Sequence, residues 1–122
     1  MQLTHHFDGG HLALENTTDV RTLDLSGVSA IALHFPKFTD GRAYTQAYLL
    51  RRRLRFTGEL IATGDVLVDQ IQHMQRCGFS VAVLRADQDL SAAQRLLALF
   101  DGFYQGDASQ AAPHFSRQKV IA

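Results

Sequence analysis

Residues 29–42 read SAIALHFPKFTDGR, and this stretch decides the fold. Its first seven residues, Ser29 to Phe35, form a mostly apolar run that is typical of a strand covered on both faces. Pro36 cannot donate a backbone hydrogen bond to a neighbouring strand, so it marks the end of this one. Apolar residues then recur at helical spacing, which predicts a helix over about residues 43–54.

The same strand-then-helix pattern occurs twice more along the chain. Residues 59–62 predict a second strand, followed by a helix that ends at Cys77-Gly78. Residues 79–84 predict a third strand, followed by a helix over about residues 91–104. Such alternation indicates a parallel sheet with right-handed crossovers. The predicted fold class is therefore α/β, with three consecutive βα units forming a small parallel sheet.

The N-terminal residues 1–27 predict a β-hairpin and a connector. The two strands would be Leu3–Phe7 and Leu12–Glu15, joined by the tight-turn sequence Asp8-Gly9-Gly10. A three-stranded parallel sheet has two open edges. This hairpin is the candidate for covering one of them, which would make the sheet mixed, and a second subunit in a homodimer is the alternative.

The chain is expected to form one domain over residues 1–104, with the three βα units in residues 28–104. Residues 105–122 are small and polar and contain Pro113, so they are expected to form a flexible tail that is disordered or docks on a partner.

Composition excludes several classes of protein. Twelve Lys and Arg balance twelve Asp and Glu, so no net field attracts nucleic acid or an anionic membrane. No apolar run approaches the roughly 20 residues of a membrane span, and no signal peptide is recognisable, so a cytoplasmic protein is expected. The single cysteine, Cys77, cannot form a thiolate cluster for a metal. No dinucleotide or Walker motif is present, so no cofactor is expected. The six histidines do not form the convergent set of three or four ligands that a metal site needs, so no metal is expected.

Ligands of open parallel sheets bind at the carboxyl ends of the strands. Three loops follow those ends here, and they carry the candidate residues for binding an anion or a partner: Lys37, Thr39, Asp40, Gly41, Arg42, Tyr44, Gly64, Arg85 and Asp87. Arginine offers a planar fork that suits oxyanions and carboxylates. The alternative is structural, with Asp40 and Asp65 as helix caps that pair with the nearby cations.

An enzymatic role would need a base at the same edge. Asp65 and Asp69 are the candidates, with Arg42 as a clamp for an anionic substrate. A carboxylate base needs burial to raise its pKa. The arginine run Arg51–Arg53, with Arg55, has two interpretations. It is either a docking site for an acidic partner or nucleic acid, or a solvated helix end where cations favour the helix dipole. The second is favoured because a neutral chain does not suit nucleic-acid binding.

Several segments together resemble one bacterial family, catalogued as domain of unknown function 934 (DUF934). They are Phe35–Ala47, Leu49–Arg51, Gly58–Leu60, Gly64–Gln70, Met74–Phe79 and Leu84–Gln88, and they agree in order and spacing over about residues 28–104. The resemblance implies a product of sulfur-assimilation operons encoded beside the sulfite reductase haemoprotein. Members of the family are also labelled loosely as oxidoreductases involved in sulfite reduction.

The resemblance carries no established catalytic residues. It suggests an accessory protein of assimilatory sulfite reduction that binds either the reductase haemoprotein or a small oxyanion at the carboxyl edge of the sheet. A small-molecule enzyme or oxidoreductase component using the same edge is a second hypothesis, and a structural or oligomerisation module is a third.

Overall fold

The computed structural model describes residues 1–100 of the chain. The strands are β1 (Gln2–Thr4), β2 (Leu12–Leu14), β3 (Ala30–Phe35), β4 (Glu59–Gly64) and β5 (Val81–Val83). The helices are α1 (Arg42–Arg52), α2 (Ile71–Cys77) and α3 (Leu90–Phe100), with short 3-10 turns η1 (Val20–Thr22) and η2 (Val68–Gln70). The predicted helix end at residue 104 and the predicted tail 105–122 lie outside the described residues.

All five strands belong to one parallel sheet with the order β1-β5-β4-β3-β2. The three βα units predicted from the sequence supply its centre, where β3 pairs with β4 and β4 with β5. The α/β class and the parallel arrangement are therefore confirmed, and the sheet is wider than predicted.

The prediction of an N-terminal β-hairpin is wrong, because β1 and β2 do not pair with each other. β1 pairs with β5 at one edge of the sheet and β2 pairs with β3 at the other, and both run parallel to their partners. The turn-forming glycines therefore do not join adjacent antiparallel strands, and the sheet is not mixed. Strands of three residues are short, and short strands at both edges limit pairing with other chains.

One face of the sheet carries the main hydrophobic core. Alternate residues of the central strands point toward α1 and α2, where they meet a buried stripe on each helix. The fully buried members include Ile31, Leu33, Phe35, Leu60, Ala47, Leu50, Ile71 and Met74. This packing fixes where α1 begins, and therefore where the loop between β3 and α1 lies.

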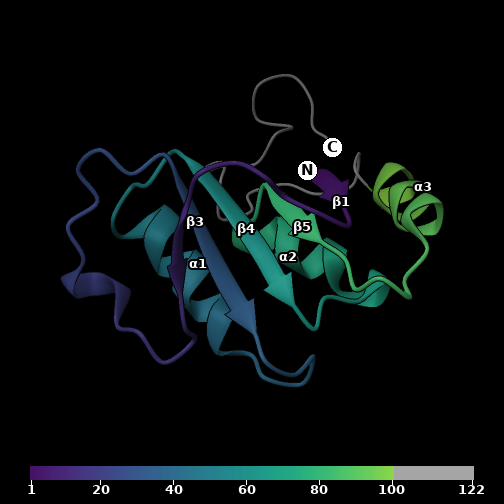
Figure 1. The fold of residues 1–122 in the computed structure, drawn as a ribbon, viewed down its shortest axis with the longest axis horizontal. Coiled ribbons are helices and arrows are strands. Elements are labelled where there is room, and N and C mark those ends of the chain that lie inside the picture. Colours follow the sequence, from purple (N-terminus) through teal and green to yellow (C-terminus); the bar gives the residue numbers. More distant parts are fainter. Residues whose placement is uncertain (101–122) are drawn as a thin grey trace.

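The opposite face is covered by the connection between β1 and β2 (Figure 1). Phe7 of that connection and Val83 of β5 both pack against a cluster of buried residues on this face: Ala30, Ala32, Ile61 and Val81. The connections from β3 to β4 and from β4 to β5 run along the helix face, and each step leads toward the β1 edge of the sheet. The connection from β1 to β2 leads in the opposite direction, from the β1 edge to the β2 edge. It can therefore be right-handed only if it crosses the other face of the sheet.

The second βα unit departs from its predicted form. Asp65 is not the N-cap of a long helix, because residues 66–67 continue the loop, η2 follows, and α2 itself begins at Ile71. The predicted end is confirmed, since Gly78 adopts a left-handed φ of 110°. No helix within residues 1–100 has the length and apolar character that a membrane crossing needs.

Candidate functional site

The loops after β3, β4 and β5 meet at the carboxyl edge of the sheet. Gly64 ends β4 with φ of 93°, and a side chain there would collide with the Phe35 carbonyl and the His34 ring. This close approach lets the Asp65 backbone N–H donate to the Phe35 carbonyl at 2.8 Å. Arg85 N–H likewise donates to the Val66 carbonyl at 3.0 Å, so the backbone ties all three loops together.

Asp65 connects the three loops through its side chain. One carboxylate oxygen lies 2.5 Å from Nη1 of Arg85 and the other accepts the backbone N–H of Phe38 at 2.7 Å. Arg85 also holds Asp87 in a two-bond pair, with distances of 3.0 and 2.7 Å. The guanidinium lowers the pKa of Asp65 and lowers that of Asp87 to about 2. Both carboxylates are therefore ionised at neutral pH.

Phe38 is held in place by its backbone while its ring remains open to solvent. Its N–H donates to Asp65, and its carbonyl accepts a hydrogen bond of 2.7 Å from Nε2 of Gln70. The residue is nevertheless 48% exposed. The loop thus presents a large apolar side chain from a fixed backbone.

A second ion pair stands at the start of α1. Asp40 accepts two bonds from the Arg42 guanidinium, at 3.1 and 2.8 Å, and a third from the Arg42 backbone N–H. Nδ2 of Asn16 donates to the same carboxylate at 2.7 Å. These donors, Arg42 first, hold the pKa of Asp40 well below its usual range. Gly41 is the residue that precedes the helix and supplies no side-chain cap.

The remaining candidates stand apart from this network. Lys37, Thr39 and Asp69 are exposed, and within residues 1–100 no side-chain hydrogen bond or ion pair joins them to it. Tyr44 instead packs in the seam between α1 and α2, with its ring 5.0 Å from Phe35 and 4.3 Å from His73. Burial, followed by nearby Cys77, raises the pKa of Tyr44 to about 12.

The charges at this edge are nearly balanced by internal pairing. Arg42 is matched by Asp40, and Arg85 is shared by Asp65 and Asp87. An incoming oxyanion would have to displace a carboxylate held by two or more bonds. Asp65 is also a poor general base, because Arg85 lowers its pKa where base catalysis at neutral pH needs a raised one.

Potential metal-ligating side chains do not cluster in the described part of the chain. No group of three or more His, Cys, Asp or Glu side chains there is arranged to hold an ion. Two pairs of such side chains do lie close together: His6 Nε2 is 2.5 Å from Asp8 Oδ1, and Cys77 Sγ is 3.8 Å from His73 Nε2. Burial raises the pKa of Cys77.

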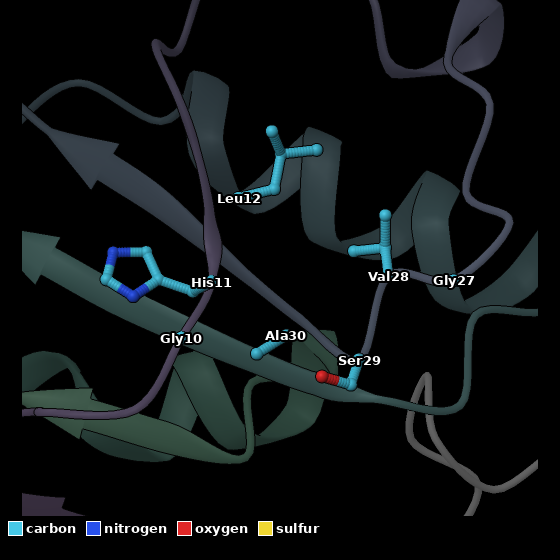
Figure 2. Close-up of a pocket in the computed structure, with 7 residues that line it drawn as sticks. All are labelled: Gly10, His11, Leu12, Gly27, Val28, Ser29 and Ala30. Atoms are coloured by element: carbon cyan, nitrogen blue, oxygen red, sulfur yellow. The ribbon is translucent and has the colours of Figure 1, made fainter.

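A hollow of about 360 Å³ lies at the opposite, amino end of β2 and β3 (Figure 2). His11 and Ser29 line it, but the imidazole ring points away from the serine (Figure 2). The two side chains therefore do not form a nucleophile–base pair.

Comparison with known proteins identifies one family. The model of a bacterial protein family of unknown function, DUF934, matches residues 11–115. The chain belongs to this family. No curated protein and no solved structure matches the chain.

Three residues that take part in the contacts at this edge were not predicted from the sequence: Asn16, Phe38 and Gln70. Asn16 and Gln70 act through tertiary hydrogen bonds across 24 and 32 residues, for which the sequence carries no signal. Phe38 did carry a signal, because a large apolar side chain between Lys37 and Thr39 in a polar loop has no local structural reason.

Proposed function

We propose that this DUF934 protein is an accessory protein of assimilatory sulfite reduction that docks on the sulfite reductase haemoprotein. The docking surface consists of Phe38 at its centre, with Lys37, Asp65, Arg85 and Asp87 around it. The family resemblance suggests the pathway and the partner, and the arrangement of the carboxyl edge supports binding through this surface.

The observation that carries the proposal is the exposed ring of Phe38 on a backbone held at both its N–H and its carbonyl. Protein interfaces obtain most of their binding energy from a few aromatic and arginine side chains enclosed by polar neighbours. A preformed loop loses little conformational entropy when it binds. The paired charges around Phe38 would set the orientation of the partner.

The same observations favour a protein partner over an oxyanion. The guanidinium groups of Arg42 and Arg85 are already occupied by carboxylates. A protein surface can pack on Phe38 and form hydrogen bonds to the rims of these pairs without breaking them. Among the described residues of the docking surface, Lys37 is the one cation that a free anion of sulfite size could bind without such competition.

Isothermal titration of the purified chain into the reductase haemoprotein tests the proposal. Phe38→Ala is expected to weaken binding by about 2 kcal/mol, or roughly 30-fold, as expected for the loss of a central aromatic anchor. Tyr48→Ala is the matched control, because Tyr48 is 47% exposed on α1 outside the docking surface. Failure of the unaltered chain to bind, or equal effects of both substitutions, would contradict the proposal.

A further inference from the structure

Three exposed cations lie together at the C-terminal end of α1. They are Arg52, Arg53 and Arg55, here called the α1 arginine patch, and no ion pair within residues 1–100 involves any of them. The arginines of the carboxyl edge differ, because each of those is held by at least one carboxylate. The α1 arginine patch therefore offers positive charge that no internal carboxylate occupies.

The backbone beneath the patch is held in place by Arg51. The guanidinium of this half-buried residue donates to the carbonyls of Phe56, Gly58 and Gly78 at 2.7–2.9 Å. The Phe56 N–H in turn donates to the Leu50 carbonyl at 2.8 Å, which closes the end of the helix. A partner that binds the patch would therefore have to order side chains but little backbone.

Arg55 adopts a backbone conformation that glycine usually takes. Its φ is 58°, and within residues 1–100 it is the one residue other than glycine with a positive φ. A helix often ends on a left-handed residue, and that residue is usually glycine because a side chain is strained there. The chain thus carries a cation where stability alone favours glycine, and backbone strain of this kind is common at functional sites.

Arg52 is oriented by an aromatic ring. The carbon of its guanidinium lies 5.7 Å from the centroid of the Tyr48 ring, one helical turn earlier. Stacking of this kind uses the face of the guanidinium and leaves the N–H groups at its edge available. Those N–H groups form the planar fork that binds both oxygens of a carboxylate.

The small size of the patch selects among anionic partners. Three cations are fewer than the roughly six to ten phosphate contacts of a strong nucleic-acid binder. They are also fewer than the roughly four to eight basic residues that hold a protein on an anionic membrane. The chain as a whole is neutral and adds no long-range attraction for either. We propose that the α1 arginine patch binds a short acidic peptide segment of a partner protein through closely spaced carboxylates.

The patch and the docking surface lie at opposite ends of α1. Because β3 and β4 are parallel, α1 runs back from the carboxyl edge to the amino end of the strands (Figure 1). Its 11 residues give it a length of about 16 Å. An acidic segment on the patch would therefore not compete with a protein docked on Phe38, and its binding does not depend on the proposed role of the reductase.

Titration of hexaglutamate into the ¹⁵N-labelled full chain, followed by NMR, tests the inference. Saturable shifts are expected for the backbone amides of residues 51–57. Exposed ion pairs are screened by salt, so the affinity is expected to fall at least about tenfold when the ionic strength rises from about 0.02 M to about 0.5 M.

Charge-removing variants locate the response. The triple variant Arg52→Gln, Arg53→Gln and Arg55→Gln is expected to weaken hexaglutamate binding at least about tenfold. Arg95→Gln is the matched control, because Arg95 is exposed on α3 and forms no ion pair within residues 1–100. It is expected to leave the affinity unchanged.

Arg55→Gly separates binding from stability. Glycine relieves the left-handed backbone, so the melting temperature is expected to stay the same or rise. The affinity for hexaglutamate is expected to fall about threefold, because one of the three cations is lost. A lower melting temperature with unchanged binding would show that Arg55 serves the fold instead.

The inference is overturned if hexaglutamate causes no saturable shift at residues 51–57, or if Arg95→Gln loses as much affinity as the triple variant. It is also overturned if a hexathymidylate oligonucleotide or phosphatidylserine vesicles bind the patch more tightly than hexaglutamate. These comparisons of anions use the unaltered protein, so they remain decisive even if a substitution impairs folding.

Discussion

At the scale of single residues, Asp65 has the largest structural role at the carboxyl edge. Its two oxygens join Arg85, which follows β5, to the backbone of Phe38, which follows β3. A change at this one position should therefore loosen two loops that are distant in sequence.

Asp65→Asn is expected to lower the melting temperature at neutral pH, with Asp69→Asn as the control because Asp69 is exposed and has no side-chain partner within residues 1–100. The folded-state pKa of Asp65 lies below its ordinary value of 3.8. Its stabilising contribution is therefore complete above that value and disappears as the pH falls through the lowered pKa. The gap in melting temperature between the unaltered chain and Asp65→Asn should narrow below about pH 4. A gap that widens in acid would contradict this role.

Arg51 corrects the interpretation of the arginine run as a solvated helix end. Its guanidinium is half-buried and donates to the carbonyls of Gly78, Phe56 and Gly58 at 2.7–2.9 Å. It therefore joins the ends of α1 and α2 to the start of β4. Arg52 and Arg53 are exposed, as that interpretation predicted.

Arg51→Met keeps the length of the side chain and removes the donors, so three carbonyl groups lose a charged partner. We expect a loss of about 1–3 kcal/mol in the free energy of unfolding, measured by urea denaturation. Arg53→Met, at an exposed position, should change it by no more than about 0.5 kcal/mol. Equal effects of the two substitutions would show that the three hydrogen bonds contribute little.

At the scale of elements, the connection between β1 and β2 is the part that the sequence did not predict correctly. The apolar pattern of residues 3–14 suits a hairpin and two separate edge strands equally well, because period-2 alternation says nothing about the partner strand. The separate edge strands allow Phe7 to pack on the sheet face opposite the helices. That packing depends on small residues at positions 30 and 32, which are distant in sequence.

Phe7→Ala should uncover this second apolar face. Because Phe7 is only partly buried, we expect a loss of about 1–3 kcal/mol in the free energy of unfolding, below that of a fully buried phenylalanine, together with increased binding of an apolar dye. His6→Ala, one residue earlier and exposed, is the control. An unchanged stability for Phe7→Ala would mean that the connection does not hold the sheet face.

The central elements were predictable for a physical reason. Buried parallel strands are apolar throughout, and their helices bear a single stripe, so β3, α1, β4 and β5 each carry a local pattern. The meeting of three loops at one edge follows from the parallel arrangement. The pairing within that edge does not, because only the folded chain brings Arg85 to Asp65 across 20 residues.

At the scale of the whole molecule, the carboxyl edge is a surface whose loops are joined by hydrogen bonds and paired charges and which carries the exposed ring of Phe38. Its Arg–Asp pairs hold the loops, and the ring of Phe38 is free to make contacts. This division of roles favours docking over catalysis or anion capture.

The most direct test of that central claim is amide hydrogen exchange of the chain alone and in the presence of the sulfite reductase haemoprotein, read by mass spectrometry. The account predicts that the reductase slows exchange in peptides covering residues 36–42, 65–70 and 85–89, and leaves the peptides of β1, β2 and the start of β3 unchanged. Slower exchange confined to other regions, or no change at saturating reductase, would contradict it.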